Sequence, residues 1–362
     1  MIYKEVTKCN LDSKELFSQR DEDGYIVLDG KLPEFTPNSR EKVGNENRIK
    51  NWIETKDGKQ FLIKSNAKLD GEENYMEYAE LICMKIAEKM GLEYAKYDII
   101  KYNGEKGIIT ENMLNKDEYM FTLEDFISSS QENPDSPDII DYIDTVNQLG
   151  KKLKEYNYSN KDSKKIIKEF NKRVIFDSIV GATDRHAENI SFIGNVKNSK
   201  DIRLSPIYDT ENSLLLENNV ELVTSLAFDK KRCSTAALST YPKLAIVPNK
   251  DADPTDITRA TFEFSTMSLD EDDYELEDFA AEQLESLDMD DIFDRVENQI
   301  NSIIPIQVKN VAKICVNQRI KDLSKMLDGR AEVDYDREYM NGIRDKISQR
   351  RENMARKEDI SN

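Results

Sequence analysis

The spacing of apolar residues divides the chain into a strand-rich first part and a helix-rich remainder. Up to position 113, short alternating or continuous apolar runs predict strands, and Asp57-Gly58 and Asn103-Gly104 suit hairpin turns. One stretch in this part, Asn74–Met90, has apolar residues at helical spacing instead. The predicted strands are Tyr25–Asp29, Arg48–Glu54, Gln60–Lys64, Tyr97–Lys101 and Lys106–Thr110.

From position 114 onward the periodicity is mainly helical. Apolar repeats within 139–153 and 166–179 predict two helices, and a strand pair follows at Asn189–Gly194 and Asp201–Asp209. Helical spacing returns over Glu275–Ile304, Val308–Leu327 and Glu338–Met354. We therefore predict an α+β chain with a small β-rich N-lobe (1–113), a larger helical C-lobe (114–330) and a charged C-terminal helix or tail (331–362).

Composition narrows the classes of partner. The 362 residues include 52 basic and 71 acidic side chains, a formal net charge of −19. A phosphate-coated partner would be repelled, so we expect no direct binding to nucleic acid or to an anionic membrane. No apolar run approaches the ~18–20 residues of a membrane span, and the first residues lack the apolar core of a secretion signal. A cytoplasmic location is expected, with secretion or delivery into a host cell left open.

Cysteine and histidine are too sparse for several kinds of site. The four cysteines are widely separated and form no C-x-x-C pair, so a zinc ribbon or a disulfide scaffold is not indicated. His186 is the only histidine, and a Ser-His-Asp triad would have to use it. Any catalysis is expected to depend mostly on carboxylates, lysine and metal-binding oxygen atoms.

One segment combines residues that suit phosphoryl transfer. Asp184 and Asn189 are five positions apart, between an apolar helix and a strand, which is the spacing of base and metal ligand in the kinase catalytic loop. A carboxylate can accept the proton of an attacking hydroxyl, and an amide oxygen can bind Mg²⁺. Asp209, at the end of the next strand pair, could supply a second carboxylate. By itself this pattern also fits a capped turn.

Two upstream residues add to the pattern. Lys64 ends an apolar strand, from which its ammonium could reach a cleft, although a solvated strand end is the ordinary alternative. Glu80 lies among apolar neighbours on the helix predicted at 74–90, so burial would favour a cationic partner. A Lys–Glu pair of this kind positions nucleotide phosphates in kinases. The ordered set Lys64, Glu80, Asp184, Asn189 and Asp209 favours a kinase.

Three segments of the chain resemble the HipA-like serine/threonine kinases, including the shorter CtkA-type members. They are Ala182-Thr-Asp-Arg-His-Ala-Glu-Asn189, Leu204-Ser-Pro-Ile-Tyr-Asp209 and Glu80-Leu-Ile-Cys-Met-Lys-Ile-Ala-Glu-Lys-Met-Gly91. The resemblance implies a two-lobed protein-kinase-like fold, Mg-ATP as phosphoryl donor and a Ser or Thr of a protein as acceptor. The oxygen atoms of Asn189 and Asp209 would suit Mn²⁺ as well as Mg²⁺.

The same resemblance implies roles for individual residues. Asp184 is then the catalytic base, Asn189 and Asp209 are metal ligands, and Lys64 binds phosphate with Glu80 as its partner. His186 would lie against the catalytic loop and the nucleotide, or would be a satisfied turn histidine.

The chain departs from the usual kinase pattern in several places. No G-x-G-x-x-G is present, and Gly44 and Asn45 occupy the expected place of the phosphate-covering loop. Asp209-Thr210-Glu211 stands where many kinases have D-F-G. The nucleotide hinge is expected at Glu111, Asn112 and Met113, where backbone groups could pair with adenine.

Other readings stay open. The family suggests self-phosphorylation, with Thr36 and Ser39 as candidates, although an ordinary polar loop explains these residues as well. Residues 268–291 carry twelve acidic side chains and no basic one, which suits either a basic partner or a solvated surface. A lipid or small-molecule kinase and a catalytically silent pseudokinase that only binds a partner are the alternative functions.

Overall fold

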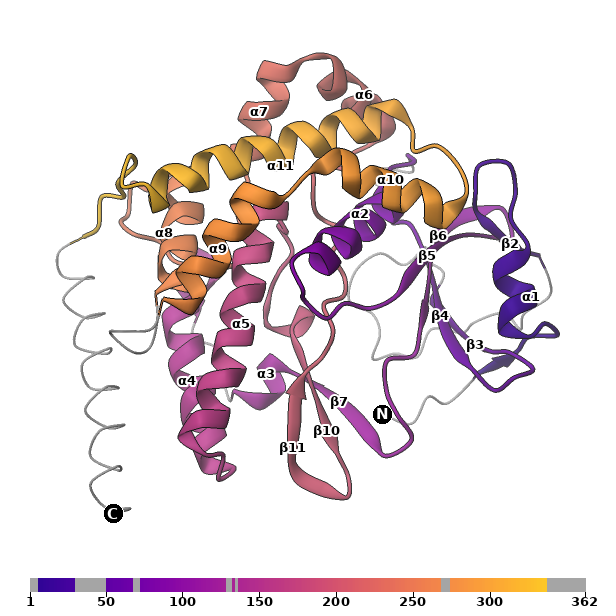
Figure 1. Ribbon diagram of the computed structural model, residues 1–362, viewed down its shortest axis with the longest axis horizontal. Coiled ribbons are helices and arrows are strands. Elements are labelled where there is room, and N and C mark those ends of the chain that lie inside the picture. Colours follow the sequence, from indigo (N-terminus) through magenta and orange to yellow (C-terminus); the bar gives the residue numbers. More distant parts are fainter. Residues whose placement is uncertain are drawn as a thin grey trace. The chain divides into compact units, whose positions relative to one another are not determined.

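The chain folds into two compact units, each assembled from three separate segments. The computed structural model describes residues 6–29, 50–67, 72–127, 132–133, 136–267 and 274–336 (Figure 1). Gly44, Asn45, Thr36, Ser39 and the helix predicted at Glu338–Met354 lie outside these ranges. The first unit comprises Met1–Lys116, Ser205–Ala237 and Leu287–Val316, and the second comprises Asp117–Leu204, Leu238–Ser286 and Asn317–Asn362.

A six-stranded sheet forms the centre of the first unit, in the order β1-β3-β4-β6-β5-β2. The inner pairs are antiparallel, and the edge strands β1 and β2 pair in parallel with β3 and β5. The five predicted strands are confirmed to within two residues at each end, and Gly58, Asn103 and Gly104 have the positive φ of tight turns. The strands are β1 (Thr7–Lys8), β2 (Ile26–Leu28), β3 (Lys50–Glu54), β4 (Gln60–Ser65), β5 (Tyr97–Tyr102) and β6 (Glu105–Glu111).

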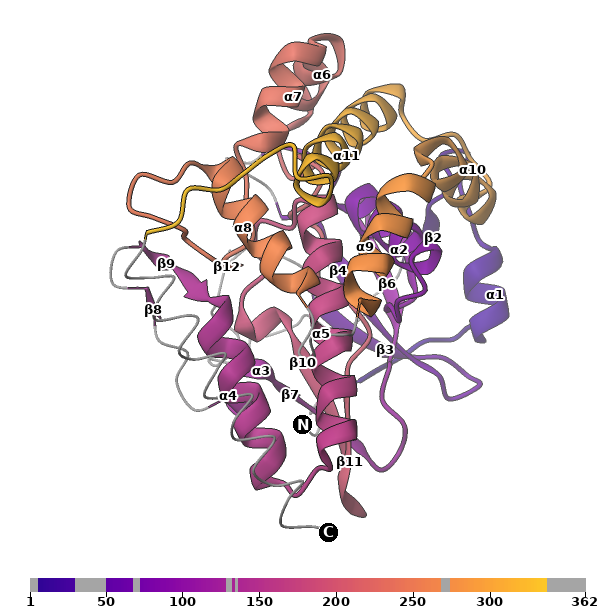
Figure 2. The same cartoon turned by 60° about the vertical axis from the view of Figure 1, so that its left-hand side comes forward.

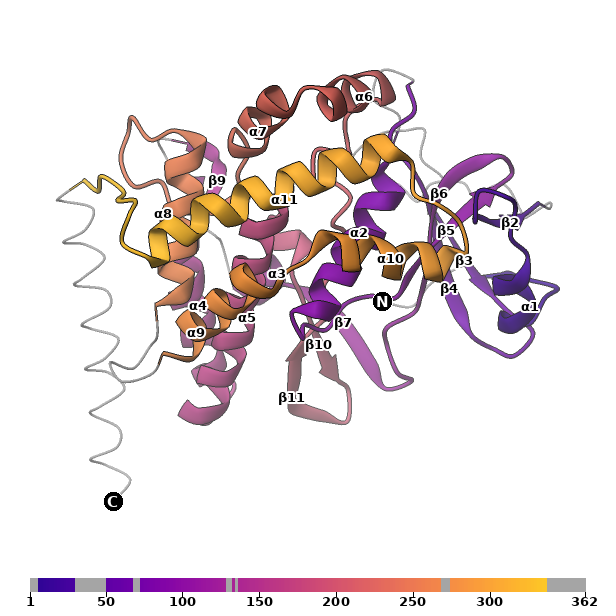
Figure 3. The ribbon, with the colours of Figure 1, turned by 45° about the horizontal axis from the view of Figure 1, so that its top comes forward.

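Side chains alternate along β4, so one face of the strand packs against the hydrophobic core and the other carries Lys64. Phe61 and Ile63 belong to a hydrophobic cluster that includes Leu16 of the short helix α1 (Ser13–Ser18), which lies beside β2 in Figure 3. Because successive residues of a strand point to opposite faces, Lys64 lies on the other face of the sheet from Phe61 and Ile63.

Helix α2 (Met76–Lys89) confirms the prediction of a helix at 74–90. It packs against β5 and β6, and nearly all of its residues from Met76 to Ala87 are buried, which is more than a one-sided apolar stripe requires. Glu80, at the middle of this helix, is therefore only 1% exposed. A carboxylate so far from water needs donors or a cation near it.

The remaining helices of the first unit differ in part from the prediction. Helices α6 (Val220–Phe228) and α7 (Lys230–Leu238) were not predicted. The helix predicted over Glu275–Ile304 is wrong as a single element, because it consists of α9 (Glu275–Ser286), in the second unit, and α10 (Met289–Ile300), in the first. Asp288 interrupts it by accepting a hydrogen bond from the backbone N–H of Asp290, which caps a new helix. Helix α11 (Ile306–Leu327) confirms the next prediction and has residues in both units.

The second unit combines helices with two small sheets. Strands β11-β10-β7 form one sheet and β12-β9-β8 the other. Helices α4 and α5 lie side by side (Figure 2), and α5 also packs against α8 and α9. Buried side chains of α4, α5 and α8 form one hydrophobic cluster with residues of β10 and β11. The bounds are β7 (Glu118–Thr122), α3 (Leu123–Phe126), β8 (Glu132–Asn133), β9 (Ser136–Asp141), α4 (Tyr142–Glu155), α5 (Asn160–Val180), η1 (Ala187–Asn189), β10 (Ser191–Asn195), β11 (Asn198–Leu204), β12 (Leu244–Ala245) and α8 (Pro254–Thr266).

One strand prediction is wrong at its end. The strand predicted over Asp201–Asp209 is β11, which stops at Leu204. Pro206 cannot donate a backbone hydrogen bond to a sheet, so the ladder cannot continue through it. Asp209 consequently lies in a loop, with a left-handed φ of 58°. The residue does not emerge directly from a strand.

The acidic segment 268–291 is partly packed. Residues 268–273 lie outside the described ranges, while Leu284 and Leu287 are buried and the ring of Phe279 lies under the ammonium of Lys172. Glu275 forms ion pairs with Lys172 and with Lys168 of α5. A basic partner for this segment stays a prediction. Within the described ranges, no helix combines the length and apolar character that a membrane span requires.

Candidate active site

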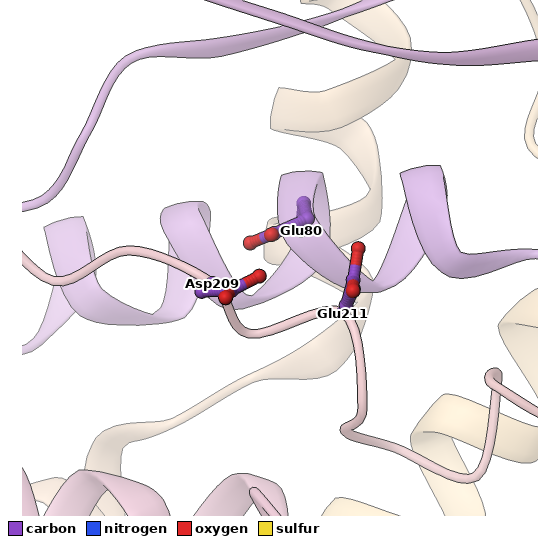
Figure 4. Close-up of side chains that lie close together, drawn as sticks. All are labelled: Glu80, Asp209 and Glu211. Atoms are coloured by element: carbon purple, nitrogen blue, oxygen red, sulfur yellow. The ribbon is translucent and has the colours of Figure 1, made fainter. Parts of the chain in front are cut away.

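Lys64 lies in a cluster of carboxylates in the first unit. Its ammonium forms ion pairs with Asp209 and, at 3.0 Å, with Glu211. The lysine is buried, 9% exposed, which contradicts the alternative of a solvated strand end. Figure 4 shows Glu80, Asp209 and Glu211 converging, and one oxygen from each lies within 4.8 Å of the others. The predicted residues Lys64, Glu80 and Asp209 are therefore brought together.

Glu80 binds the loop that carries Asp209. One of its oxygens, Oε2, accepts hydrogen bonds from the backbone N–H of Thr210 at 2.9 Å and from its hydroxyl at 2.6 Å. The other oxygen, Oε1, is buried and has no hydrogen-bond partner in the part of the chain that the structure describes. Burial, followed by the charge of Asp209, raises the pKa of Glu80 to about 7. The carboxylate is thus held in place with one acceptor still open.

Asp209 is fixed through its backbone as well. Its N–H donates a hydrogen bond to the hydroxyl oxygen of Tyr97 at 3.0 Å. Burial, with the nearby charge of Glu80, raises the pKa of Tyr97 well above its usual value, so the phenol stays neutral. A left-handed φ at a non-glycine residue is uncommon and is most often found at Asn and Asp. These constraints aim the Asp209 carboxylate at the cluster.

The position of Lys64 on β4 depends on a close approach by β6. Gly107 pairs with Ser65, and a Cβ atom at position 107 would lie 2.1 Å from the carbonyl oxygen of Lys64. Since no side chain fits in that space, glycine is required for the two strands to pair here.

The predicted hinge at Glu111–Met113 follows β6 directly. Asn112 is already engaged: its backbone N–H donates to the carbonyl of Gln60 at 2.8 Å, and its side-chain amide donates to the Gln60 side chain. Of the three residues, Met113 is the one for which the described ranges hold no hydrogen bond. Its backbone groups are the ones left to pair with a ligand.

The loop with Asp184 and Asn189 belongs to the second unit and follows α5. Gly181 ends that helix in the left-handed conformation, with a φ of 66°. Arg185 anchors the loop, since its guanidinium forms a buried ion pair with Asp177 of α5 and donates to the carbonyl of Asn189 at 2.9 Å. Burial raises the pKa of Asp177, and the charge of Arg185 opposes that shift.

Asp184 is accessible and has a cation beside it. The ammonium of Lys243 donates to its Oδ1 at 2.7 Å, and Nε2 of His186 lies 3.8 Å from the same oxygen. Lys243 reaches this place because its neighbour Leu244 donates a backbone hydrogen bond to the carbonyl of Arg185. The Nδ1 atom of His186 accepts from the N–H of Glu188, so His186 is at least a satisfied turn residue.

Asn189 is oriented by its own loop. Its side-chain N–H donates to the carbonyl of Asp184 at 2.8 Å. The amide oxygen then points away from that bond and has no hydrogen-bond partner within the described ranges. Asn189 therefore presents an oxygen of the kind that Mg²⁺ prefers, in the same loop as Asp184.

The residues present fit a hard divalent cation. In the first unit, the open oxygen of Glu80 and the carboxylates of Asp209 and Glu211 are oxygen donors that converge. In the second unit, the amide oxygen of Asn189 is a donor of the same kind. Such donors suit Mg²⁺ or Mn²⁺ and suit softer metals poorly.

Two residues of these clusters were not predicted from the sequence. Glu211 is two positions after Asp209, and its acidic type in place of the usual glycine was the available signal. Lys243 is 59 positions after Asp184 and has no motif around it. A pocket of about 390 Å³ in the first unit is a separate feature, because neither Lys64, Glu80 nor Asp209 lines it.

Comparisons with known proteins place these residues in a family. The model of the HipA-like C-terminal domain matches residues 38–302, which is more than half of the chain. No curated protein matches. A solved structure of the proinflammatory kinase CtkA from Helicobacter pylori is similar over 82% of this chain and 96% of its own, with a TM-score of 0.60 and 14% identity, which shows a shared fold.

A second solved structure is the HipA, HipB and operator DNA complex from Shewanella oneidensis MR-1. It covers 75% of this chain and 61% of that chain, with a TM-score of 0.47 and 14% identity. The family-model match spans Lys64, Glu80, Asp184, Asn189 and Asp209 together. The chain belongs to the family of the HipA-like C-terminal domain and has the fold of a HipA-type kinase.

Proposed function

We propose that the protein is an ATP-dependent kinase that transfers the γ-phosphate to a serine or threonine hydroxyl of a protein. The observation that carries the proposal is the arrangement of side chains in the 184–189 loop. Arg185 anchors the loop, the carboxylate of Asp184 is accessible and paired with Lys243, and the amide oxygen of Asn189 has no hydrogen-bond partner within the described ranges. These are the two groups that a kinase catalytic loop must present.

In this proposal Asp184 orients the acceptor hydroxyl and takes its proton. The ammonium of Lys243, 2.7 Å from Asp184, would stabilise the negative charge on the transferred phosphoryl group. Lys64 holds the phosphates of ATP, and Tyr97 and Glu80 hold the loop that carries Asp209. The backbone of Met113 pairs with adenine.

A bound Mg²⁺ or Mn²⁺ would neutralise charge on the phosphates, with Asn189 and Asp209 as the residues that would hold it. This function requires Asp184 and Asp209 to act on one nucleotide. The protein acceptor is the one that the resemblance to HipA-like serine/threonine kinases implies, and the family match supports that part of the proposal.

The proposal is tested by phosphate transfer from radiolabelled ATP into the proteins of a cell lysate, with Mg²⁺ present. We expect labelled protein bands with the wild type and none with Asp184→Asn, and acid hydrolysis of the bands should release phosphoserine or phosphothreonine. Label in extracted lipids but not in protein would replace this proposal with a lipid kinase. ATP binding without any transfer would favour a silent binding module.

A further inference from the structure

Lys64 is the residue expected to hold the ATP phosphates, and kinases position it with a glutamate from the helix that follows the lysine strand. In this chain that glutamate would be Glu80. Two observations on the first unit point to a different partner: the contacts that Glu80 makes, and the exposure of the two carboxylates that pair with Lys64.

The first observation concerns Glu80. Its oxygen Oε2 already accepts two hydrogen bonds from Thr210, through the backbone N–H and the hydroxyl. Those bonds fix the turn between Asp209 and Glu211 against α2. Glu80 thus holds the loop that carries Asp209, and it does so through Thr210, which is uncharged.

The second observation concerns the carboxylates that contact Lys64. Asp209 and Glu211 both pair with its ammonium, but their exposure differs: the Asp209 side chain is 30% exposed and that of Glu211 is 8% exposed. An ammonium has three N–H donors, so one carboxylate can leave while another keeps its bond. Asp209, the more accessible one, is the carboxylate that can turn to a cation.

Glu211 is the carboxylate that stays. It is buried beside a lysine that is 9% exposed, and separating such a pair leaves an uncompensated charge away from water. We propose that Glu211 positions Lys64 for the phosphates of ATP, while Glu80 positions the Asp209–Glu211 turn through Thr210. This inference rests on the proposed kinase function and assigns Glu211 a role in it.

The test compares the affinities of Mg-ATP and adenosine by titration calorimetry of the full chain. Glu211→Gln removes the charge that orients Lys64, so we expect Mg-ATP to bind about 10- to 100-fold more weakly. Adenosine has no phosphates, so its affinity should not change. Glu80→Gln should weaken Mg-ATP binding less than Glu211→Gln does.

Two further variants serve as a control and as a test of whether Lys64 and Glu211 act together. Glu77→Gln changes another buried glutamate of α2, which contacts Tyr25 and Asn66 instead of the cluster, and should bind both ligands as the wild type does. Lys64→Met combined with Glu211→Gln should lose no more Mg-ATP affinity than Lys64→Met alone, because the two residues act through one ammonium.

Each contrary result has a distinct meaning. Unchanged Mg-ATP affinity in Glu211→Gln, or a larger loss in Glu80→Gln, would overturn the role of Glu211 and leave the kinase proposal standing. Equal loss of adenosine and Mg-ATP would show that Glu211 only supports the fold. A wild type that binds no Mg-ATP would overturn the proposed function itself.

Discussion

Lys243 and Asp184 form an ion pair of 2.7 Å although 59 positions separate them in the chain. Both side chains remain accessible, with 44% and 37% exposure. An ion pair this exposed contributes little to stability, so substitutions at either residue can be made without unfolding the protein.

The first prediction concerns Asp184. Asp184→Asn should keep the melting temperature and the ATP affinity of the wild type, because the side chain is accessible and its shape is preserved. Loss of the proton acceptor should lower turnover on the order of 10²–10⁴-fold. Glu188→Gln, an exposed change in the same loop, is the matched control and should retain activity. Near wild-type transfer with a lower melting temperature would identify Asp184 as a turn-capping residue.

The second prediction concerns Lys243. Lys243→Met should reduce turnover by about 10- to 100-fold, which corresponds to the loss of one charge-assisted hydrogen bond at the reacting groups. Lys243→Arg should restore part of that loss. Lys197→Met removes an exposed ion pair with Asp117 in the same unit and serves as the control. A Lys243→Met variant as active as the control would show that the lysine only covers Asp184 in the resting protein.

The third prediction concerns the metal. Mg-ATP should raise the melting temperature of the wild type, and Asp209→Asn should abolish that rise. Asparagine removes the charge and still tolerates the left-handed backbone at position 209. Adenosine should stabilise both proteins to the same extent. If Mg-ATP stabilised the variant as strongly as the wild type, Asp209 would not be a metal ligand.

The fourth prediction concerns pH. The pKa of Glu80 is raised from 4.5 to about 7 in the folded protein, so the folded state binds the proton more tightly than the unfolded state does. Stability should therefore fall as pH rises from about 4.5 to 7. Glu80→Gln removes the buried charge, and its melting temperature should exceed that of the wild type at pH 8, by roughly 1–2 °C for each kcal/mol of destabilisation that is removed.

At pH 5 most of the Glu80 carboxyl is protonated in the folded state, so the gain from Glu80→Gln should nearly vanish. Turnover should still be lower than in the wild type, because the Thr210 contact is altered. A variant that melts lower than the wild type at pH 8 would contradict this account of Glu80.

The strands and the helix α2 were predictable because they depend on local signals. Lys64 was expected at the end of an apolar strand, and the apolar surroundings of Glu80 predict the burial that the structure shows. Pro206 could also have marked the end of β11, since it cannot join a ladder. Helix α8 had a visible signature as well, because Asp253 caps it and Pro254 is its first residue.

Pairings over long sequence distances were not predictable in the same way. Lys243 reaches Asp184 through β12, a two-residue strand too short to show any periodicity. Thr210 donates to one oxygen of Glu80, and the ion pairs of Lys64 are formed with Asp209 and Glu211 instead. Which of several nearby carboxylates pairs with a lysine depends on the tertiary fold and cannot be predicted from local sequence patterns.

Gly107 shows how a mutational screen of this protein could mislead. The residue has no charge and no side chain, yet any substitution would drive a carbon atom against the carbonyl of Lys64. Loss-of-function scores at position 107 should therefore be as severe as those at Lys64. A list of essential positions built from such scores would count Gly107 among the catalytic residues. The position is essential only because β4 and β6 can pair there when residue 107 has no side chain.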